Sequence, residues 1–162
     1  MSSGEPVNLV FEQLWHSEED TAATGQALAS LLQPGDVIAL VGDLGAGKTR
    51  FVQAVAKGLD VPDEMVHSPT FTLIHEYRGR HPLRHCDAYR LKNSDEFTDL
   101  GLDELFGEDG VAFVEWADRV AEFIPRDHLR IELTVAGIST RQARFIATGQ
   151  RSAEIVRRLS LL

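Results

Sequence analysis

Apolar runs separated by short turn signals divide the chain into alternating strands and helices. Residues 7–14 are predicted to form a first strand, and residues 37–41 form an unbroken apolar run. Such a run is typical of a parallel strand that helices cover on both faces. Further strands are predicted at residues 71–77, 83–89, 111–116, 129–135 and 144–147, and the last few of these are expected to pair antiparallel.

Helix signals fall between these strands. Ser17 with Asp20 three residues later is a weak capping box, and Pro34-Gly35 ends the helix that follows it. Apolar residues at positions 51, 55 and 59 predict a second helix, and those at 155, 156, 159 and 162 predict an amphipathic helix at the C-terminus. The pattern therefore predicts an α/β three-layer sandwich, with a mixed, mostly parallel central sheet flanked by helices.

Length and composition narrow the class of protein. The 162 residues, 43% hydrophobic and 25% charged, predict a single folded domain over residues 1–162. A net charge of −9 opposes broad docking on nucleic-acid phosphates or anionic lipid. Cys86 is the sole cysteine, so no internal disulfide forms, and every apolar stretch is far shorter than a membrane span. We therefore expect a cytoplasmic protein.

A glycine-rich segment follows the apolar strand. Gly42-Asp43-Leu44-Gly45-Ala46-Gly47-Lys48-Thr49 has two glycines with four residues between them, then Lys and Thr, between a strand and a helix. Small residues let backbone N–H groups turn inward on a phosphate, and the helix N-terminus adds partial positive charge. Lys48 would reach the β- and γ-phosphates and the Thr49 hydroxyl would bind Mg²⁺. An ordinary strand-to-helix turn has no need of the Lys-Thr pair. The sequence thus predicts a P-loop NTPase-like fold.

Two acids are candidates to complete this site. Glu115 ends the apolar strand 111–114, where ligands of open α/β sheets bind, and would support Mg²⁺ directly or through water. Strand alternation puts His85, Asp87 and Tyr89 on one face. Asp87 would orient the attacking water or hold a metal-bound water, with His85 positioning Asp87. The alternatives are a solvated strand end for Glu115 and a polar edge strand for Asp87.

A zinc site is a competing interpretation of His81, His85 and Cys86. Alternation points His85 and Cys86 to opposite faces of one strand, and the ligand spacing of zinc sites is missing. Zinc is therefore disfavoured.

The segment Ser68-Pro69-Thr70-Phe71-Thr72 lies between the loop helix and the next strand. Nucleotide switches often occupy this position, and the Thr70 hydroxyl would sense the γ-phosphate and its Mg²⁺. A turn with a capping hydroxyl explains the segment equally well.

Four motifs taken together resemble one family. Gly42 to Thr49, Ser68 to Thr72, the run His85-Cys86-Asp87-Ala88-Tyr89-Arg90 and Val114-Glu115-Trp116 match the TsaE (YjeE) family in order and spacing. The resemblance spans roughly residues 14–135. This sequence has Phe71 where members often carry Tyr, and Cys86-Asp87-Ala88 where Phe-Asp-Leu is common, and neither change removes a proposed catalytic group.

The resemblance implies a bacterial ATPase that acts with the proteins TsaB and TsaD. Such a protein is required to form N6-threonylcarbamoyladenosine at position 37 of tRNAs that read codons beginning with A, and it meets the tRNA indirectly through its partners. It also implies that Lys48 and Thr49 bind phosphate and Mg²⁺, that Glu115 supports the metal and that Asp87 assists hydrolysis. Thr70 would belong to a switch, and Trp116 would lie near the nucleotide.

Other nucleotide-binding classes remain as alternatives. A small-molecule kinase needs a lid and an acceptor pocket, for which 162 residues leave little room. A GTPase is disfavoured because no Asn/Thr-Lys-x-Asp motif occurs. A nucleotide-gated adaptor that does not hydrolyse ATP would leave Asp87 and Glu115 structural. The residues that contact the base stay open, with residues 10–15 and 126–130 as the segments considered.

Overall fold

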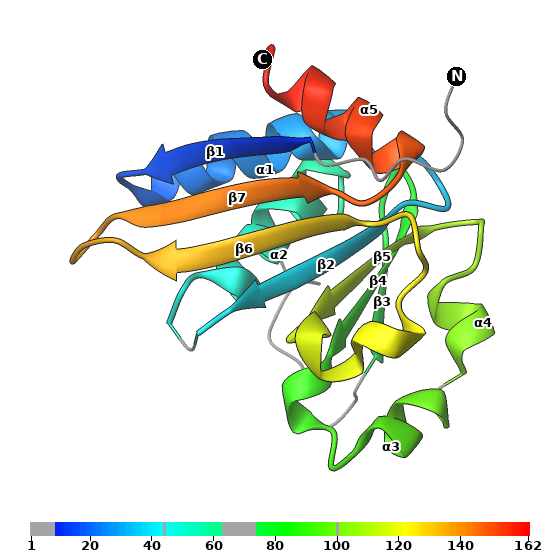
Figure 1. Cartoon of the computed structure of the whole chain (residues 1–162). Helices are drawn as coiled ribbons and strands as arrows, with labels where there is room; N and C mark the ends of the chain where they lie inside the picture. Colours follow the sequence, from blue (N-terminus) through cyan, green and yellow to red (C-terminus); the bar gives the residue numbers. More distant parts are fainter. Residues whose placement is uncertain (1–8, 44, 63–73, 100) are drawn as a thin grey trace.

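Seven strands form one sheet in the residues that the structure describes, which are 9–43, 45–62, 74–99 and 101–162 of the computed structural model (Figure 1). The order across the sheet is β1-β7-β6-β2-β5-β4-β3. The strands are β1 (Val10–Trp15), β2 (Val37–Gly42), β3 (Ile74–Arg78), β4 (Pro82–Asp87), β5 (Val111–Glu115), β6 (Leu129–Val135) and β7 (Arg141–Ala147).

The centre of the sheet is parallel and its margins are antiparallel. Strands β6, β2, β5 and β4 pair parallel with one another, whereas β7 pairs antiparallel to β6, β1 to β7, and β3 to β4. Strand β1 consequently points the same way as the parallel centre, and β7 and β3 run against it. The predicted mixed, mostly parallel α/β sheet is confirmed.

Helices cover the two faces of the sheet unequally. On one face pack α1 (Glu18–Leu31), α2 (Lys48–Gly58) and α5 (Gln150–Leu159), and on the other lie α3 (Ser94–Thr98), α4 (Leu102–Leu105) and the 3₁₀ helices η2 (Ala88–Arg90) and η3 (Ala117–Phe123) (Figure 1). Strand β2 has apolar side chains on both faces of the sheet, so both faces are covered. Ile38 and Leu40 belong to the first core cluster, under α1, α2 and α5, and Val37 and Ala39 belong to the second, on the other face. Within the described residues, no helix is long and apolar enough to cross a membrane.

Most predicted boundaries agree with the structure to within a few residues. Ser17 caps α1, as predicted, by accepting a hydrogen bond from the backbone N–H of Asp20 at 3.2 Å. The prediction that Tyr89 extends a strand is wrong. Strand β4 ends at Asp87 because its carboxylate accepts a hydrogen bond from the backbone N–H of Tyr89 at 3.1 Å, which starts η2. Residues 71–73 of the predicted strand 71–77 lie outside the described residues.

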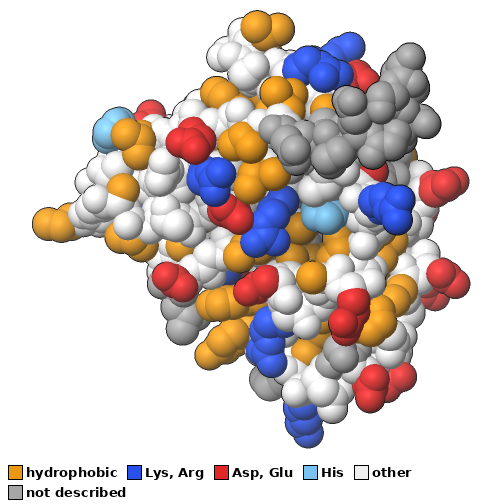
Figure 2. Space-filling view, in the orientation of Figure 1, with side chains coloured by type: hydrophobic (Ala, Val, Ile, Leu, Met, Phe, Trp, Pro, Cys, Tyr) orange, Lys and Arg blue, Asp and Glu red, His pale blue; other side chains and the backbone are white. Residues whose placement is uncertain are grey.

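The outer face of β1, β7 and β6 carries a row of alternating charges. Arg144 lies at its centre and contacts Glu12 at 3.2 Å and Glu132 at 2.9 Å, and Glu132 also contacts Arg130 at 2.9 Å. Figure 2 shows acidic and basic side chains interspersed across the face turned to the viewer. Because the charges neutralise one another, the row offers no basic surface for nucleic-acid phosphates.

Asp36 joins three parts of the fold and is the basis of a stability prediction. Its side chain is 4% exposed and accepts two hydrogen bonds from Arg151 of α5, both at 2.9 Å, and one from the backbone N–H of Gln33 at 2.8 Å. Replacing Asp36 with alanine removes two charged hydrogen bonds and leaves the Arg151 guanidinium only its contacts with the Leu31 carbonyl oxygen and Glu154, so we expect a loss of about 2–4 kcal/mol in the free energy of unfolding. Urea denaturation measures this loss.

Arg158→Ala is the matched control, because Arg158 lies on the same helix in an exposed pair with Glu154 at 3.4 Å. Exposed pairs of this kind contribute little, so the control should change the free energy of unfolding by less than about 0.5 kcal/mol. Equal losses in the two variants would contradict the role given to Asp36.

The sole cysteine gives a prediction about pH. Burial, with smaller contributions from the charges of Asp87 and Glu115, raises the pKa of Cys86 from 9.0 to about 12. Above pH 9 the unfolded chain releases this proton while the folded chain retains it, so stability present below pH 9 is lost progressively up to about pH 12. We expect this thiol to lower the free energy of unfolding of the wild type, measured by urea denaturation, by at most about 1.4 kcal/mol per pH unit. Cys86→Ala should lack this component, and an identical pH dependence in both proteins would refute it.

Candidate functional site

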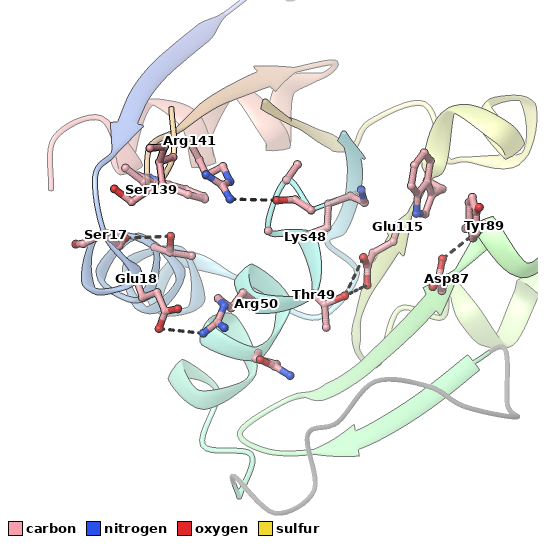
Figure 3. Close-up of a pocket in the computed structure, with 18 residues that line it drawn as sticks. Ser17, Glu18, Lys48, Thr49, Arg50, Asp87, Tyr89, Glu115, Ser139 and Arg141 are labelled. Carbon is pink, nitrogen blue, oxygen red and sulfur yellow. Dashed lines mark hydrogen bonds and ion pairs between the residues drawn. The ribbon is translucent and has the colours of Figure 1, made fainter. Parts of the chain in front are cut away.

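A cavity of about 900 Å³ opens where the glycine-rich loop joins β2 to α2. It lies at the carboxyl ends of β2, β5 and β4, the edge of an open α/β sheet where ligands bind. Figure 3 shows its labelled side chains in two groups on either side of Lys48 and Thr49. The lining residues are Trp15, Ser17, Glu18, Thr21, Gly45, Ala46, Gly47, Lys48, Thr49, Arg50, Gln53, Asp87, Tyr89, Glu115, Trp116, Ile138, Ser139 and Arg141.

The backbone of the loop adopts conformations that favour glycine, as Gly47 and Gly42 show. Gly47 precedes α2 with φ = 98°, a conformation that side chains rarely adopt. At Gly42, φ is 158° and a Cβ atom would lie 2.5 Å from the carbonyl oxygen of Leu133. The loop therefore keeps its path between β6 and α2 because these residues lack side chains. Leu44, also predicted to contact phosphate, lies outside the described residues.

Lys48 is folded back onto the loop that carries it. Its side-chain amine donates to the carbonyl oxygens of Gly42 at 2.5 Å and Asp43 at 2.9 Å, and lies 4.1 Å from the centre of the Trp116 ring. Burial lowers the pKa of Lys48, and the nearby carboxylates of Glu115 and Asp87 oppose that change. The amine is thus held at the loop, against the aromatic ring, by short contacts that an incoming phosphate would have to replace.

Thr49 and Glu115 meet across the boundary between α2 and β5. The Thr49 hydroxyl lies 3.4 and 3.5 Å from the two carboxylate oxygens of Glu115, whose whole residue is 3% exposed. Glu115 also contacts the ring Nε2 of His85. This differs from our expectation that His85 positions Asp87. In the register of β4 and β5, Asp87 is level with Glu115 and already caps η2, which leaves His85 to reach the carboxylate diagonally.

The donors of Thr49 and Glu115 fit a magnesium ion. A hydroxyl and a carboxylate are the hard oxygen ligands that Mg²⁺ prefers, and Mg²⁺ takes its other ligands from phosphates and water. The described residues contain no group of three or more His, Cys, Asp or Glu side chains arranged to hold a metal. The two residues of β4 considered as zinc ligands lie on opposite faces of the strand. Cys86 packs into the second core cluster, whereas His85 contacts Glu115.

Asp87, Tyr89 and Trp116 form the wall of the cavity beyond Lys48. The Tyr89 and Trp116 rings lie with centroids 4.9 Å apart, and Tyr89 is 49% exposed. Trp116 follows Glu115 directly with φ = 58° and ψ = 40°, a conformation that is rare for an aromatic residue and is often found at functional sites. This backbone turn lets Glu115 and Trp116 line the same cavity.

The sequence analysis did not identify Arg141, Glu18 and Arg50, which line the cavity on the side away from Asp87 and Tyr89 (Figure 3). Arg141 of β7 donates to the carbonyl oxygen of Gly45 at 3.2 Å, which ties the turn between β6 and β7 to the glycine-rich loop. Glu18 of α1 pairs with Arg50 of α2 at 3.0 Å. A motif search could not find these residues, because residues 96 positions apart, such as Gly45 and Arg141, become neighbours only through the order of the strands.

Of the two segments considered for contact with a base, only residues 10–15 contribute to the described lining of the cavity. Trp15, at the end of the segment 10–15, lines the cavity. Residues 126–130 contribute nothing to the described lining, because β6 begins at Leu129 and runs parallel to β2, which puts its first residues at the opposite edge of the sheet. Thr70 lies outside the described residues, so its predicted switch role stays a prediction.

Comparison with known proteins gives one consistent family. A family model described as "Threonylcarbamoyl adenosine biosynthesis protein TsaE" matches residues 15–143. The chain is 46% identical to a tRNA threonylcarbamoyladenosine biosynthesis protein TsaE from Bacillus subtilis, covering 88% of this chain and 89% of that protein. It is 42% identical to the protein of the same name from Treponema pallidum, covering 78% of this chain and 93% of that protein.

A solved structure supports the same relationship. The crystal structure of YdiB from Bacillus subtilis superposes with a TM-score of 0.80 at 37% sequence identity, covering 96% of this chain and 97% of that one. The chain therefore belongs to the TsaE family, the proteins of tRNA threonylcarbamoyladenosine biosynthesis.

Proposed function

We propose that this protein is an ATP hydrolase that supports, with TsaB and TsaD, formation of N6-threonylcarbamoyladenosine at position 37 of tRNAs reading codons that begin with A. One observation carries the proposal: Lys48, Thr49, Asp87 and Glu115 line a single cavity around a glycine-rich loop. These are the residue types that bind phosphate, hold Mg²⁺ and orient water in P-loop enzymes. Membership of the TsaE family supports the pathway.

The loop and the first turn of α2 would hold the triphosphate. Backbone N–H groups of Gly45 to Thr49 would face the phosphates, and the helix N-terminus adds partial positive charge. Lys48 would exchange its contacts with the carbonyl groups of Gly42 and Asp43 for the β- and γ-phosphates. Thr49 and Glu115 would hold Mg²⁺, which when bound neutralises charge on the phosphate oxygens.

Asp87 is the group proposed to act on water. It lies at the end of β4, level with Glu115 in the sheet, and lines the cavity on the Tyr89 and Trp116 side. From this wall its carboxylate would orient a water molecule toward the γ-phosphate. The nucleoside would then extend to the opposite wall, between Trp15 and Arg141.

The protein is proposed to depend on its partners for rapid turnover. A net charge of −9 and a self-neutralised row of charges on the open sheet face do not favour direct binding of tRNA phosphates. TsaB and TsaD would instead hold the tRNA, and hydrolysis by this subunit would reset their complex.

A phosphate-release assay tests the proposal. ATP hydrolysis should be slow for the protein alone and should rise when purified TsaB and TsaD are added. Binding of ATP without release of phosphate in the complete mixture would favour the nucleotide-gated adaptor. Transfer of ³²P from γ-labelled ATP to a small molecule would favour the kinase.

A further inference from the structure

A buried histidine contacts Glu115, one of the two residues that we propose to bind magnesium. His85 is 2% exposed and Glu115 is 3% exposed, and the ring Nε2 of His85 contacts a carboxylate oxygen of Glu115. A carboxylate only accepts hydrogen bonds, so Nε2 is the donor. Burying a carboxylate is costly unless such donors satisfy it.

The contact continues on the other side of Glu115. The same carboxylate lies 3.4 and 3.5 Å from the Thr49 hydroxyl, at the N-terminus of α2. A line of polar groups therefore runs from β4 through β5 to the first turn of α2. His85 does not line the cavity, whereas Thr49 and Glu115 do, so His85 can reach a ligand only through Glu115.

We propose that His85 is a positioning residue for the metal site. By donating to Glu115 it fixes the orientation of the carboxylate, so that the carboxylate faces Thr49 and the bound Mg²⁺-nucleotide. This inference rests on the proposed function, because it requires that the cavity take a Mg²⁺-nucleotide. Side chains that orient a metal ligand in this way typically change metal affinity or activity about 10- to 100-fold when they are replaced.

Two substitutions separate the hydrogen bond from the volume of the ring. His85→Gln places an amide donor at a reach similar to that of Nε2, whereas His85→Leu fills much of the space and donates nothing. Cys86→Ala is the matched control, because Cys86 is the next residue of β4, is fully buried and packs on the opposite face. A loss shared with Cys86→Ala would reflect strand packing and not the metal site.

The measurement is the affinity for the non-hydrolysable analogue AMP-PNP, by calorimetry, once with Mg²⁺ and once with EDTA. The ratio of the two affinities reports the metal site without any turnover. We expect His85→Leu to lower this ratio about 10-fold or more, with the metal-free affinity unchanged. His85→Gln and Cys86→Ala should stay within about threefold of the wild type, because both keep a donor to Glu115.

The outcomes distinguish this inference from the function on which it rests. A wild-type protein that binds no AMP-PNP overturns the proposed function and the inference together. Wild-type binding with the same ratio in His85→Leu overturns the inference alone. If His85→Leu does not fold, His85→Asn replaces it, since its shorter amide does not reach Glu115, and equal ratios for His85→Asn and His85→Gln overturn the inference.

Discussion

Replacing Lys48 with alanine is expected to weaken binding of Mg-ATP about 10- to 100-fold. A hydrogen bond to a charged group contributes about 1.5–3 kcal/mol, and each 1.4 kcal/mol corresponds to about a tenfold change in affinity. The amine is already held at the loop by the carbonyl oxygens of Gly42 and Asp43, so little ordering is needed before it meets a phosphate. Isothermal titration calorimetry measures the change.

Lys57→Ala is the control for this result, because Lys57 is an exposed lysine in the last turn of the same helix. It alters net charge and helix composition equally, and we expect ATP affinity within about twofold of the wild type, as for an exposed charge at a distance. Unchanged affinity in Lys48→Ala would remove the phosphate-binding role from the glycine-rich loop.

Replacing Asp87 with asparagine should separate binding from chemistry. Asparagine keeps the shape and an oxygen that accepts the hydrogen bond from Tyr89, so η2 should persist. ATP should still bind, with a slight gain as repulsion between carboxylate and phosphate disappears. Hydrolysis in the complex with TsaB and TsaD should fall about 100-fold or more, the usual scale for loss of an acid–base group. Phosphate release and calorimetry on the same preparation measure the two effects.

Asp118→Asn controls for electrostatics in this experiment. Asp118 is exposed, does not line the cavity and, like Asp87, acts on the charge of Lys48. The control removes one negative charge near the site without removing a group that faces the nucleotide. Hydrolysis at the wild-type rate in Asp87→Asn would make Asp87 a strand residue only, and Glu115 would become the leading candidate for orienting water.

Local sequence signals predicted the elements of the fold. The apolar run at residues 37–41 predicted a buried parallel strand, because only a strand covered on both faces is uniformly apolar. Ser17 predicted the start of α1, because its hydroxyl satisfies a backbone N–H that the helix leaves free. The glycine-rich loop could also be predicted from the sequence, because its glycines, its lysine and its threonine are close together in the chain.

Where a local signal competed with another, the prediction failed. Alternation alone extended a strand to Tyr89, but the carboxylate of Asp87 captures the backbone N–H of Tyr89 and turns the chain into η2. The expected partner of His85 was also wrong. Alternation placed His85 and Asp87 on one face, yet only the register of β4 against β5 shows that Glu115 is the partner of His85.

The sequence by itself determined the class of fold, the glycine-rich loop with Lys48 and Thr49, and the two acids at strand ends, because each depends on residues close together in the chain. Tertiary structure alone decided which distant residues share the cavity. The order β1-β7-β6-β2 brings Trp15 and Arg141 beside the loop, and the order β2-β5-β4 brings Glu115 and Asp87 to its other side. Strand order and register arise from packing of the whole chain, which no local pattern of residues encodes.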